Sequence, residues 1–164
     1  MELPQAAEVT LPPGYTLRRA EVADAALIAA QREAMFTDMG TEYRETVAQF
    51  APWVERHLQA GTYVGWFVEQ EAEVVAGAGL LLHDWSPHFL DPQPLRSYLQ
   101  NVYTRPEHRG RGLARALTQT AIAETRRRGI RTLSLHASKF GRPLYEQLGF
   151  VATNEMRLVL DGPS

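Results

Sequence analysis

The sequence predicts a single α/β domain in which one mixed β-sheet carries helices on both faces. The chain has 164 residues, 45% of them apolar, which suffices for one hydrophobic core. Segments rich in β-branched and aromatic residues alternate with segments of helical periodicity. Their order is β-α-α-β-β-β-α-β-α-β. This order combines hairpins with one strand-helix-strand crossover, so it predicts a mixed sheet.

The first half of the chain predicts one strand, two helices and a hairpin. Residues 15–20, YTLRRA, have the composition of a short strand, and Asp24 stands where a helix over ALIAAQREAMF would begin. A second helix is expected over roughly residues 42–59, where Pro52 should bend or divide it. The runs TYVGWFVEQ and EVVAGAGLLLHD contain strand formers and are separated by a short acidic stretch, so they predict an antiparallel hairpin. WSPHFLDPQPL, with three prolines, predicts a loop.

The second half predicts the crossover and the end of the sheet. RSYLQNVYT reads as a strand, and LARALTQTAIAETRRR reads as a helix that ends at Gly129 after the three arginines 126–128. TLSLHA predicts a further strand, RPLYEQL a short helix with proline in its first turn, and FVATNEMRLVL a final strand. We therefore expect one domain over residues 1–164, with residues 1–14 as an extended N-terminal tail.

Composition excludes several kinds of chemistry. The chain has no cysteine, which excludes disulfides, thiolate metal ligands and a cysteine nucleophile. No apolar run approaches the roughly 20 residues that a membrane-spanning helix needs, and the opening MELPQAAEVTLPPG lacks a signal-peptide pattern. We expect a cytoplasmic protein with no membrane partner and no metal.

Charge is distributed unevenly along the chain. The formal net charge is −2, but residues 1–95 carry a balance of −9 and residues 96–164 a balance of +7. Such polarisation can mark a basic surface for nucleic acid, or an anion site in one half and a cation-tolerant site in the other. Solvated faces without a ligand are the simplest alternative.

The stretch RGRGLA, residues 109–114, is the most informative motif. A helix begins near Gly112, yet no Ser, Thr, Asp or Asn precedes it to accept from its first N–H groups. Gly110 and Gly112 permit positive φ and remove Cβ atoms that would block close approach, so several amides can converge on one anion at the positive helix end. This design is typical of a pyrophosphate site, and a helix start capped by water is the alternative.

The motif does not match the usual NAD or ATP sites. The dinucleotide fingerprint G-x-G-x-x-G fails because Arg115 stands at its third glycine, and no acidic residue follows the next strand. A G-x-x-x-x-G-K-[ST] loop is also missing, and the one lysine of the chain, Lys139, lies elsewhere.

The run from Arg109, with Gly112 and Ala114 at the third and fifth positions after it, resembles the R/Q-x-x-G-x-G/A signature of the GNAT superfamily of N-acetyltransferases. The segment HASKFGRPLYEQLGF, about 30 residues later, is similar to a second segment of that family. The resemblance covers roughly residues 15–160. It implies a GNAT-like fold in which splayed central strands form an acyl-CoA cleft.

The resemblance also implies which residues hold acetyl-CoA, the co-substrate. Pantetheine would pair with the backbones of Val102 and Thr104, and an N–H near Val102 would polarise the thioester carbonyl. Ser138 takes the place of an asparagine that is frequent in the family. Arg142 and Lys139 lie where they would meet the 3′-phosphate, or are solvated surface charges. The pyrophosphate would bind the amides of Arg109, Gly110, Arg111, Gly112, Leu113 and Ala114.

Tyr145 matches the family's tyrosine in A-x-x-x-Y-x-x-x-G-F, which implies that it protonates the departing CoA thiolate. A tyrosine packed between Leu144 and Leu148 is the alternative. The general base is open between His83 and His136, and either could instead be a structural histidine.

Further acidic candidates for the base are Asp84 and Glu42. In relatives the acceptor pocket commonly involves the first two helices and the loop before the cofactor strand. Carried across, this implies lining from apolar and aromatic side chains, which could equally be core: Met35, Phe36, Met39, Tyr43, Trp85 and Phe89.

The leading functional hypothesis is an acetyl-CoA-dependent N-acetyltransferase. It would move acetyl directly to a primary amine of a small molecule or peptide in a ternary complex, and the acidic first half suits a cationic acceptor. A non-catalytic acyl-CoA-binding module is the alternative. A nucleic-acid partner ranks last, because arginines 126–128 have a local explanation at a helix end. The acceptor, the acyl group and the oligomeric state are left open, with a homodimer as one alternative.

Overall fold

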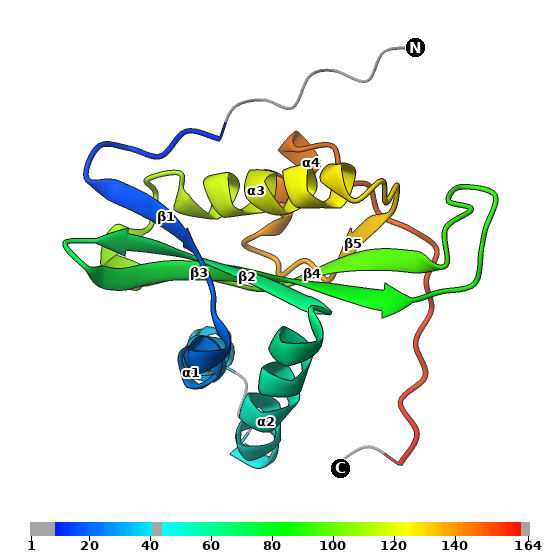
Figure 1. Ribbon diagram of the computed structural model, residues 1–164, viewed down its shortest axis with the longest axis horizontal. Coiled ribbons are helices and arrows are strands. Elements are labelled where there is room, and N and C mark those ends of the chain that lie inside the picture. The colour runs from blue at the N-terminus through cyan, green and yellow to red at the C-terminus, as the bar shows by residue number, and fades with distance from the viewer. Residues whose placement is uncertain (1–8, 41–43, 162–164) are drawn as a thin grey trace.

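Residues 9–40 and 44–161 are described by the computed structural model, and they form a five-stranded sheet with four α-helices (Figure 1). The strands are β1 (Tyr15–Arg19), β2 (Tyr63–Gln70), β3 (Glu73–Asp84), β4 (Leu95–Thr104) and β5 (Leu133–Leu135). The helices are α1 (Ala25–Asp38), α2 (Arg44–Ala60), α3 (Leu113–Arg127) and α4 (Arg142–Gln147). The strands lie side by side in chain order. Only the β4–β5 pair is parallel, so the sheet is mixed as expected.

Helices cover both faces of the sheet. α1 and α2 lie on one face, and α3 and α4 lie on the other (Figure 1). Alternate side chains of β2 point to opposite faces of the sheet. Val64, Trp66 and Val68 belong to the core that includes the apolar stripe of α3. Tyr63 and Phe67 pack with α1 and α2 on the other face. A strand that is apolar on both sides is therefore explained by burial between two helical layers.

The predicted element order is confirmed from β1 through α4. Of the two predicted effects of Pro52, a division of the second helix does not occur, since α2 runs from Arg44 to Ala60 with Pro52 inside it. Its neighbours Phe50, Trp53 and Val54 pack in the core on this face, and Val54 is fully buried. This packing holds the helix together at the position where proline removes one hydrogen bond.

The predicted final strand over FVATNEMRLVL is also wrong. Residues 151–160 form no strand, and Val151, Met156, Leu158 and Leu160 are 76–93% exposed. A segment with strand propensity forms a strand only where a partner strand supplies hydrogen bonds and one face of the segment is covered. In the described residues the sheet ends at β5, which pairs with β4 alone. The expected tail is outside the described residues up to residue 8, and residues 9–14 contain no helix or strand.

A β-bulge interrupts the pairing of β3 with β4. Gly77 pairs with Tyr103 and Gly79 pairs with Gln100, so two residues of β4, Asn101 and Val102, stand opposite one residue of β3. Asn101 adopts φ 59°, a left-handed conformation that asparagine tolerates better than most residues. A bulge bends its strand and increases the local twist.

β5 accompanies β4 for only a short distance. Its three residues pair with Ser97, Tyr98 and Leu99, just before the bulge. β4 continues for five more residues to Thr104. Beyond Leu99 the edge of β4 on this side has no strand partner among the described residues, and its main-chain groups are open to another extended chain.

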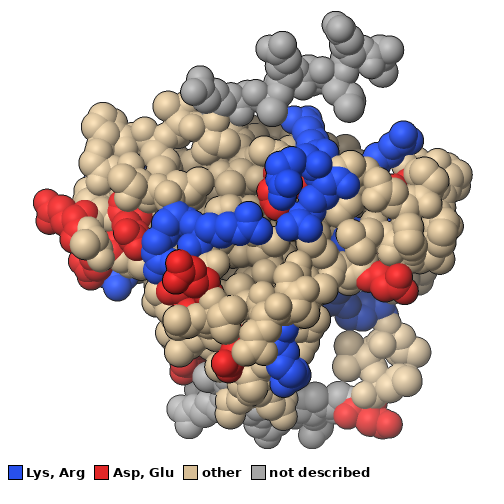
Figure 2. Space-filling view, in the orientation of Figure 1, with Lys and Arg blue, Asp and Glu red and all other residues tan. Residues whose placement is uncertain are grey.

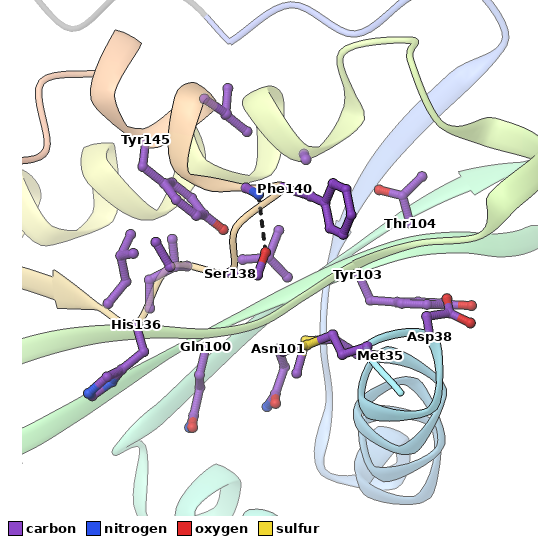
Figure 3. A pocket seen from close by; sticks show the side chains of 18 of the residues that line it. Met35, Asp38, Gln100, Asn101, Tyr103, Thr104, His136, Ser138, Phe140 and Tyr145 are labelled. Atoms are coloured by element: carbon purple, nitrogen blue, oxygen red, sulfur yellow. Dashed lines mark hydrogen bonds between the residues drawn. The ribbon is translucent and has the colours of Figure 1, made fainter. Parts of the chain in front are cut away.

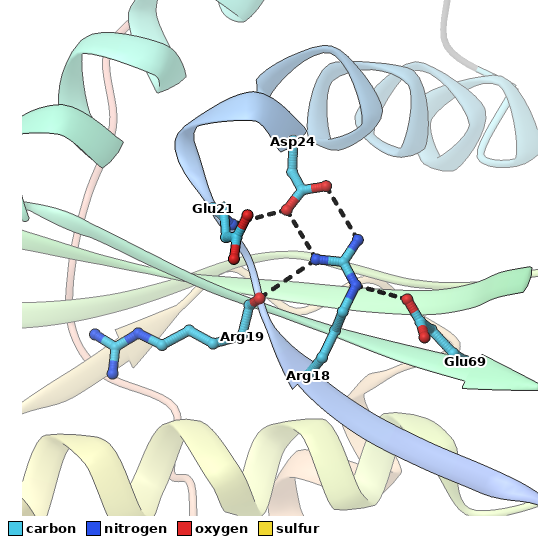
Figure 4. A network of polar contacts seen from close by, with 5 residues as sticks. All are labelled: Arg18, Arg19, Glu21, Asp24 and Glu69. Atoms are coloured by element: carbon cyan, nitrogen blue, oxygen red, sulfur yellow. Dashed lines mark hydrogen bonds and ion pairs between the residues drawn. The ribbon is translucent and has the colours of Figure 1, made fainter. Parts of the chain in front are cut away.

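Arg18 joins β1 to its neighbours (Figure 4). Its Nε donates to Glu69 Oε1 of β2 (2.6 Å), and its two Nη atoms donate to the two carboxylate oxygens of Asp24 (2.8 and 3.0 Å). Asp24 Oδ2 also accepts from the Glu21 N–H (2.7 Å). The contacts fix the start of α1 against the sheet, and hydrogen bonds from Arg18 lower the pKa of Asp24 below its ordinary value.

The arginines that end α3 pair with a shielded carboxylate. Glu124, 10% exposed at its side chain, accepts from Arg127 (2.7 Å) and Arg128 (3.0 Å), and Arg19 of β1 lies 4.0 Å away. Hydrogen bonding from Arg127 is the main reason that the pKa of Glu124 is lowered. On the face in Figure 2, blue and red side chains are interspersed. Acidic and basic side chains that are separated along the sequence therefore lie close together in the fold.

None of the helices in residues 9–40 and 44–161 is long and apolar enough to cross a membrane.

Replacing Asp24 by asparagine tests the Arg18 network. The amide oxygen of the new side chain could still accept from the Glu21 N–H, but it cannot balance the Arg18 charge. Asp24→Asn should therefore lower the free energy of unfolding by about 1–2 kcal/mol at pH 7. Because the folded pKa of Asp24 lies below 3.8, this contribution is present above about pH 4 and is lost as the pH falls through the folded value. Urea denaturation of both proteins at several pH values measures the difference.

Glu71→Gln, at an exposed position of the β2–β3 turn, is the matched control and should change the free energy by less than about 0.5 kcal/mol. A wild-type and Asp24→Asn difference that is the same at pH 3 and pH 7 would contradict the charge-based explanation.

Candidate functional site

A cavity of about 730 Å³ opens where β4 continues past the end of β5. Its walls come from four parts of the chain: α1, residues 98–104 of β4, the start of α3, and residues 135–145 (Figure 3). Side chains therefore reach it from both faces of the sheet. Tyr145 and Ser138 lie on one side of β4 in this view, and Gln100, Asn101 and Met35 lie on the other.

The start of α3 is open to an anion. Gly112 is the N-cap residue in a left-handed conformation, φ 82°, and no side chain of the described residues caps the helix. Gly110 has φ 75°, and a Cβ at either glycine would find no atom within 4 Å. The sequence prediction of an uncapped, glycine-opened helix start is confirmed. Such a start directs N–H groups and the positive end of the helix dipole outward.

The flanking arginines have different roles. Arg109 lines the cavity, where its Nε donates to the Thr104 carbonyl (3.0 Å) and its Nη2 donates to Asp38 (2.6 Å) of α1. Arg111 instead donates to the Tyr15 hydroxyl (2.9 Å) of β1. Arg109 thus joins β4 to α1 at one end of the cavity, whereas Arg111 holds the loop to the rest of the sheet.

Tyr145 of α4 lines the cavity. Burial raises the pKa of its phenol above the ordinary value of 10.0, so the hydroxyl stays protonated at neutral pH. Ser138 also lines the cavity, and its Oγ accepts from the Gly141 N–H (3.1 Å). The segment between β5 and α4 is therefore held in place by Ser138 while Tyr145 keeps a proton that it can donate.

Asn101 connects the bulge to α1 and to the core. Its Nδ2 donates to the buried Tyr63 hydroxyl (2.9 Å), and its Oδ1 accepts from Arg32 Nη1 (2.6 Å). Burial raises the pKa of Tyr63 to about 12. A Cβ at Gly79 would overlap the Tyr63 hydroxyl, so glycine at this position leaves room for the bond. Hydrogen bonds therefore fix both the amide nitrogen and the amide oxygen of the Asn101 side chain.

The two candidate histidines lie in different places. His136 lines the cavity and hydrogen bonds through Nδ1 to the Tyr98 hydroxyl, and Arg157 contacts its Nε2. His83 lies in β3 opposite Arg96, with its ring edge against Trp85, and does not line the cavity. Of the two, only His136 is near the other site residues.

Several other predicted residues come together at the cavity: Val102, Thr104, Arg109, Ala114, Ser138 and Tyr145. Leu113 is buried in the core, and Arg142 donates to Glu146 (2.5 Å) on the surface of α4. Gly110, Arg111 and Gly112 belong to the adjoining loop and do not line the cavity itself.

The predicted acceptor residues divide into two groups. Met35 and Phe36 of α1 line the cavity, as does Met39, which directly follows the helix. Trp85 and Phe89 lie in the exposed loop before β4 and do not line it. Tyr43 and Glu42, also considered from the sequence, lie outside the described residues.

Sequence reasoning missed the polar residues on the α1 side: Arg32, Asp38, Tyr98, Gln100 and Asn101. Asn101 could have been noticed, because asparagine is uncommon inside strands, and paired glycines such as Gly77 and Gly79 often mark a bulge. Arg32 gave no local signal, since its contact with Asn101 joins residues 69 positions apart.

The described residues contain no group of three or more acidic or histidine side chains that could hold a metal ion.

Comparison with known proteins identifies the family. The model of the acetyltransferase (GNAT) family matches residues 27–150, about three quarters of the chain. This protein belongs to the GNAT family of acetyltransferases. The matched range contains the bulge, the glycine loop, α3 and Tyr145, and the family uses acetyl-CoA as its acetyl donor.

Solved GNAT structures have the same fold. A GCN5-related N-acetyltransferase from Ralstonia eutropha superposes with a TM-score of 0.85 at 38% identity, over 91% of this chain and all of that one. A predicted acetyltransferase from Clostridium acetobutylicum, crystallised with acetyl-CoA, gives 0.84 at 27% identity, over 89% and 96% of the two chains. Among curated proteins, the uncharacterised N-acetyltransferase YjgM of Escherichia coli is 35% identical over 88 residues. That match spans 52% of this chain and about half, 49%, of the relative.

Two substitutions at Asn101 separate backbone from side-chain contributions. Asn101→Ala removes both hydrogen bonds. It also puts an alanine, which has no polar side chain to support a left-handed backbone, at φ 59°, so it should destabilise the fold by about 2–4 kcal/mol. Asn101→Gly removes the same bonds but accepts the left-handed backbone, and should be about 1 kcal/mol less damaging. Urea denaturation measures both values.

Asn154→Ala, at an exposed position after α4, is the control and should change stability by less than about 0.5 kcal/mol. Equal destabilisation by alanine and glycine at position 101 would show that the backbone conformation contributes nothing.

Proposed function

We propose that the protein transfers the acetyl group of acetyl-CoA directly to a primary amine of a small molecule or peptide in a ternary complex. One observation carries this proposal: the cavity reaches from the glycine-opened start of α3, past the unpaired edge of β4, to the α1 side of the sheet. It therefore offers room for a donor on one side of β4 and an acceptor on the other.

The donor side suits the parts of CoA. The amides of the loop around Gly110 and Gly112, at the positive end of α3, would receive the pyrophosphate. The amide-rich pantetheine arm would pair with the free edge of β4 at Val102 and Thr104 as an added strand. Because the Thr104 carbonyl already accepts from Arg109, pairing at that residue would use mainly its N–H group. Ser138 and Ala114 would line the path between these contacts.

The chemistry is one addition followed by one elimination. The neutral amine attacks the thioester carbon, so a C–N bond forms and charge develops on the carbonyl oxygen, which an N–H near Val102 would stabilise. The C–S bond then breaks, and the Tyr145 hydroxyl gives its proton to the CoA thiolate. The surplus proton of the amine leaves to a base or to water, and a proton returns through solvent to the Tyr145 phenolate, which restores the starting protonation states. Since the chain has no cysteine, an acetyl-cysteine intermediate does not arise.

His136 is the proposed base. It lines the same cavity as Tyr145, whereas His83 lies outside it. The Arg157 guanidinium lies at His136 Nε2 and can only donate, so in the neutral imidazole Nδ1 donates to the Tyr98 hydroxyl and Nε2 is the nitrogen that would accept a proton. The cytoplasmic location and the homodimer stay predictions from the sequence.

Gly112→Ala tests the cofactor loop. Gly61, at the turn before β2, has a similar φ of 72°, and a Cβ there also meets no atom within 4 Å. Both Gly112→Ala and Gly61→Ala should therefore lose about 1 kcal/mol of stability through backbone strain. Only Gly112→Ala should weaken acetyl-CoA binding, by roughly tenfold or more. The rise in melting temperature with increasing acetyl-CoA measures the affinity of each protein.

A wild-type protein whose melting temperature does not rise at saturating acetyl-CoA would refute both the acetyltransferase proposal and the alternative of an acyl-CoA-binding module. Equal weakening of acetyl-CoA binding in both glycine variants would mean that the α3 start has no special role.

Tyr145→Phe tests the acid. If Tyr145 protonates the thiolate, the variant should bind acetyl-CoA as wild type does but release free thiol about 100-fold more slowly at pH 7. Since the pKa of Tyr145 is raised above 10.0, any loss of wild-type kcat from ionisation of this phenol should begin only above pH 10. The readout is thiol release across a panel of amino acids, small amines, polyamines and peptides.

Glu71→Gln, at the exposed β2–β3 turn and outside the cavity lining, is the control. It should leave turnover within about twofold of wild type. Unchanged turnover in Tyr145→Phe would remove its role as acid, and acetyl-CoA binding without turnover on any amine would favour the binding module.

A further inference from the structure

The Arg109 side chain is held against β4 and α1 by three contacts. Its Nη2 donates to Asp38 Oδ2 (2.6 Å), its Nε donates to the Thr104 carbonyl (3.0 Å), and its guanidinium lies over the Tyr103 ring at 6.0 Å. Figure 3 shows Asp38 at the end of α1, on the wall of the cavity. The nitrogen that bonds Asp38 cannot bond an anion with the same N–H group.

The position of Asp38 is not explained by the helix that carries it. Asp38 is the last residue of α1, and the carbonyl end of a helix bears a partial negative charge that disfavours a carboxylate. Among the described residues that line the cavity, Asp38 is the one carboxylate. Its contact with Arg109 therefore accounts for it better than the stability of α1 does.

The Arg109–Asp38 pair is exposed enough for a ligand to open it. The two side chains are 49% and 40% exposed. Ion pairs exposed to this degree contribute roughly a factor of five or less to an equilibrium constant. A phosphate accepts charge-assisted, often bidentate hydrogen bonds from a guanidinium, so it can compete with a single carboxylate contact.

Arg109 is also placed to meet the pyrophosphate of CoA. It begins the loop of residues 109–114, and it lines the cavity together with Ala114 at the start of α3. The Nε bond to the Thr104 carbonyl can persist while the guanidinium turns about it, because only Nη2 has to leave Asp38. The side chain can therefore change partners without releasing β4.

We propose that Asp38 is a positioning residue for Arg109: it holds the guanidinium while the donor site is empty, and the pyrophosphate of CoA breaks this pair when it binds. The inference rests on the donor site of the proposed function. Asp38 then lowers the affinity for the donor. Its carboxylate is released on the α1 wall only once the donor is bound, so the charge of that wall depends on donor binding.

Asp38→Ala tests the proposal in the full chain. Calorimetric titration with CoA gives the dissociation constant, which should fall by roughly two- to fivefold because the pair no longer has to be broken. Glu73→Ala is the matched control. Glu73 is an exposed carboxylate that pairs with Arg105, just before the same loop, but it lies outside the cavity lining. It should leave the dissociation constant within about 1.5-fold of wild type.

A double-mutant cycle separates the release of Arg109 from simple charge repulsion. Arg109→Gln should weaken CoA binding by roughly tenfold. In that background Asp38→Ala should change the dissociation constant by less than about 1.5-fold, because no guanidinium is left for Asp38 to hold. If Asp38 acted only by repelling the phosphates of CoA, its removal would tighten binding equally in both backgrounds.

Unchanged or weaker CoA binding in Asp38→Ala, or an equal gain with and without Arg109, overturns the proposal. The comparison of Asp38→Ala with Glu73→Ala decides even if Arg109→Gln does not fold. CoA binding that is the same in wild type and Asp38→Ala refutes this inference alone. No CoA binding by wild type refutes the proposed function and this inference with it.

Discussion

The bulge in β4 is the constraint on which the rest of the site depends. Asn101 in a left-handed conformation, opposite the Gly77–Gly79 stretch of β3, bends the strand just after its pairing with β5 ends at Leu99. A regular β4 paired along its whole length would have no free edge and no cavity. The bulge is held by hydrogen bonds from Arg32 and to Tyr63. Local strain is therefore balanced by side chains from both the helical layer and the core.

In the proposed reaction one cavity holds both the acetyl donor and the acceptor, and the bulge makes this arrangement possible. The donor side depends on α3, whose uncapped start follows β4 after a short loop, and on Tyr145 of α4. The acceptor side depends on α1, which the bidentate Arg18–Asp24 pair anchors to the sheet. Arg109 bridges the two layers through Asp38. In the proposed reaction the donor and the acceptor meet at β4, beyond the point where its pairing with β5 ends.

The sequence predicted the parts of this fold whose causes are local. Periodicity and end signals predicted every strand and α-helix through α4, and the missing N-cap at Gly112 is confirmed. The prediction of a final strand was wrong because a strand requires a partner that composition cannot supply, and packing in the core keeps α2 undivided at Pro52. The polar residues on the α1 side were missed for a similar reason: the Arg32–Asn101 contact joins residues far apart in sequence, which no periodicity reveals.

Amide hydrogen exchange with and without CoA tests the central claim most directly, namely that the free edge of β4 and the start of α3 together bind the donor. Addition of CoA should slow exchange at the amides of Val102 and Thr104 and of residues 110–114, with β1 and β2 unchanged. Protection confined to other segments, or absent from these amides at saturating CoA, would contradict it.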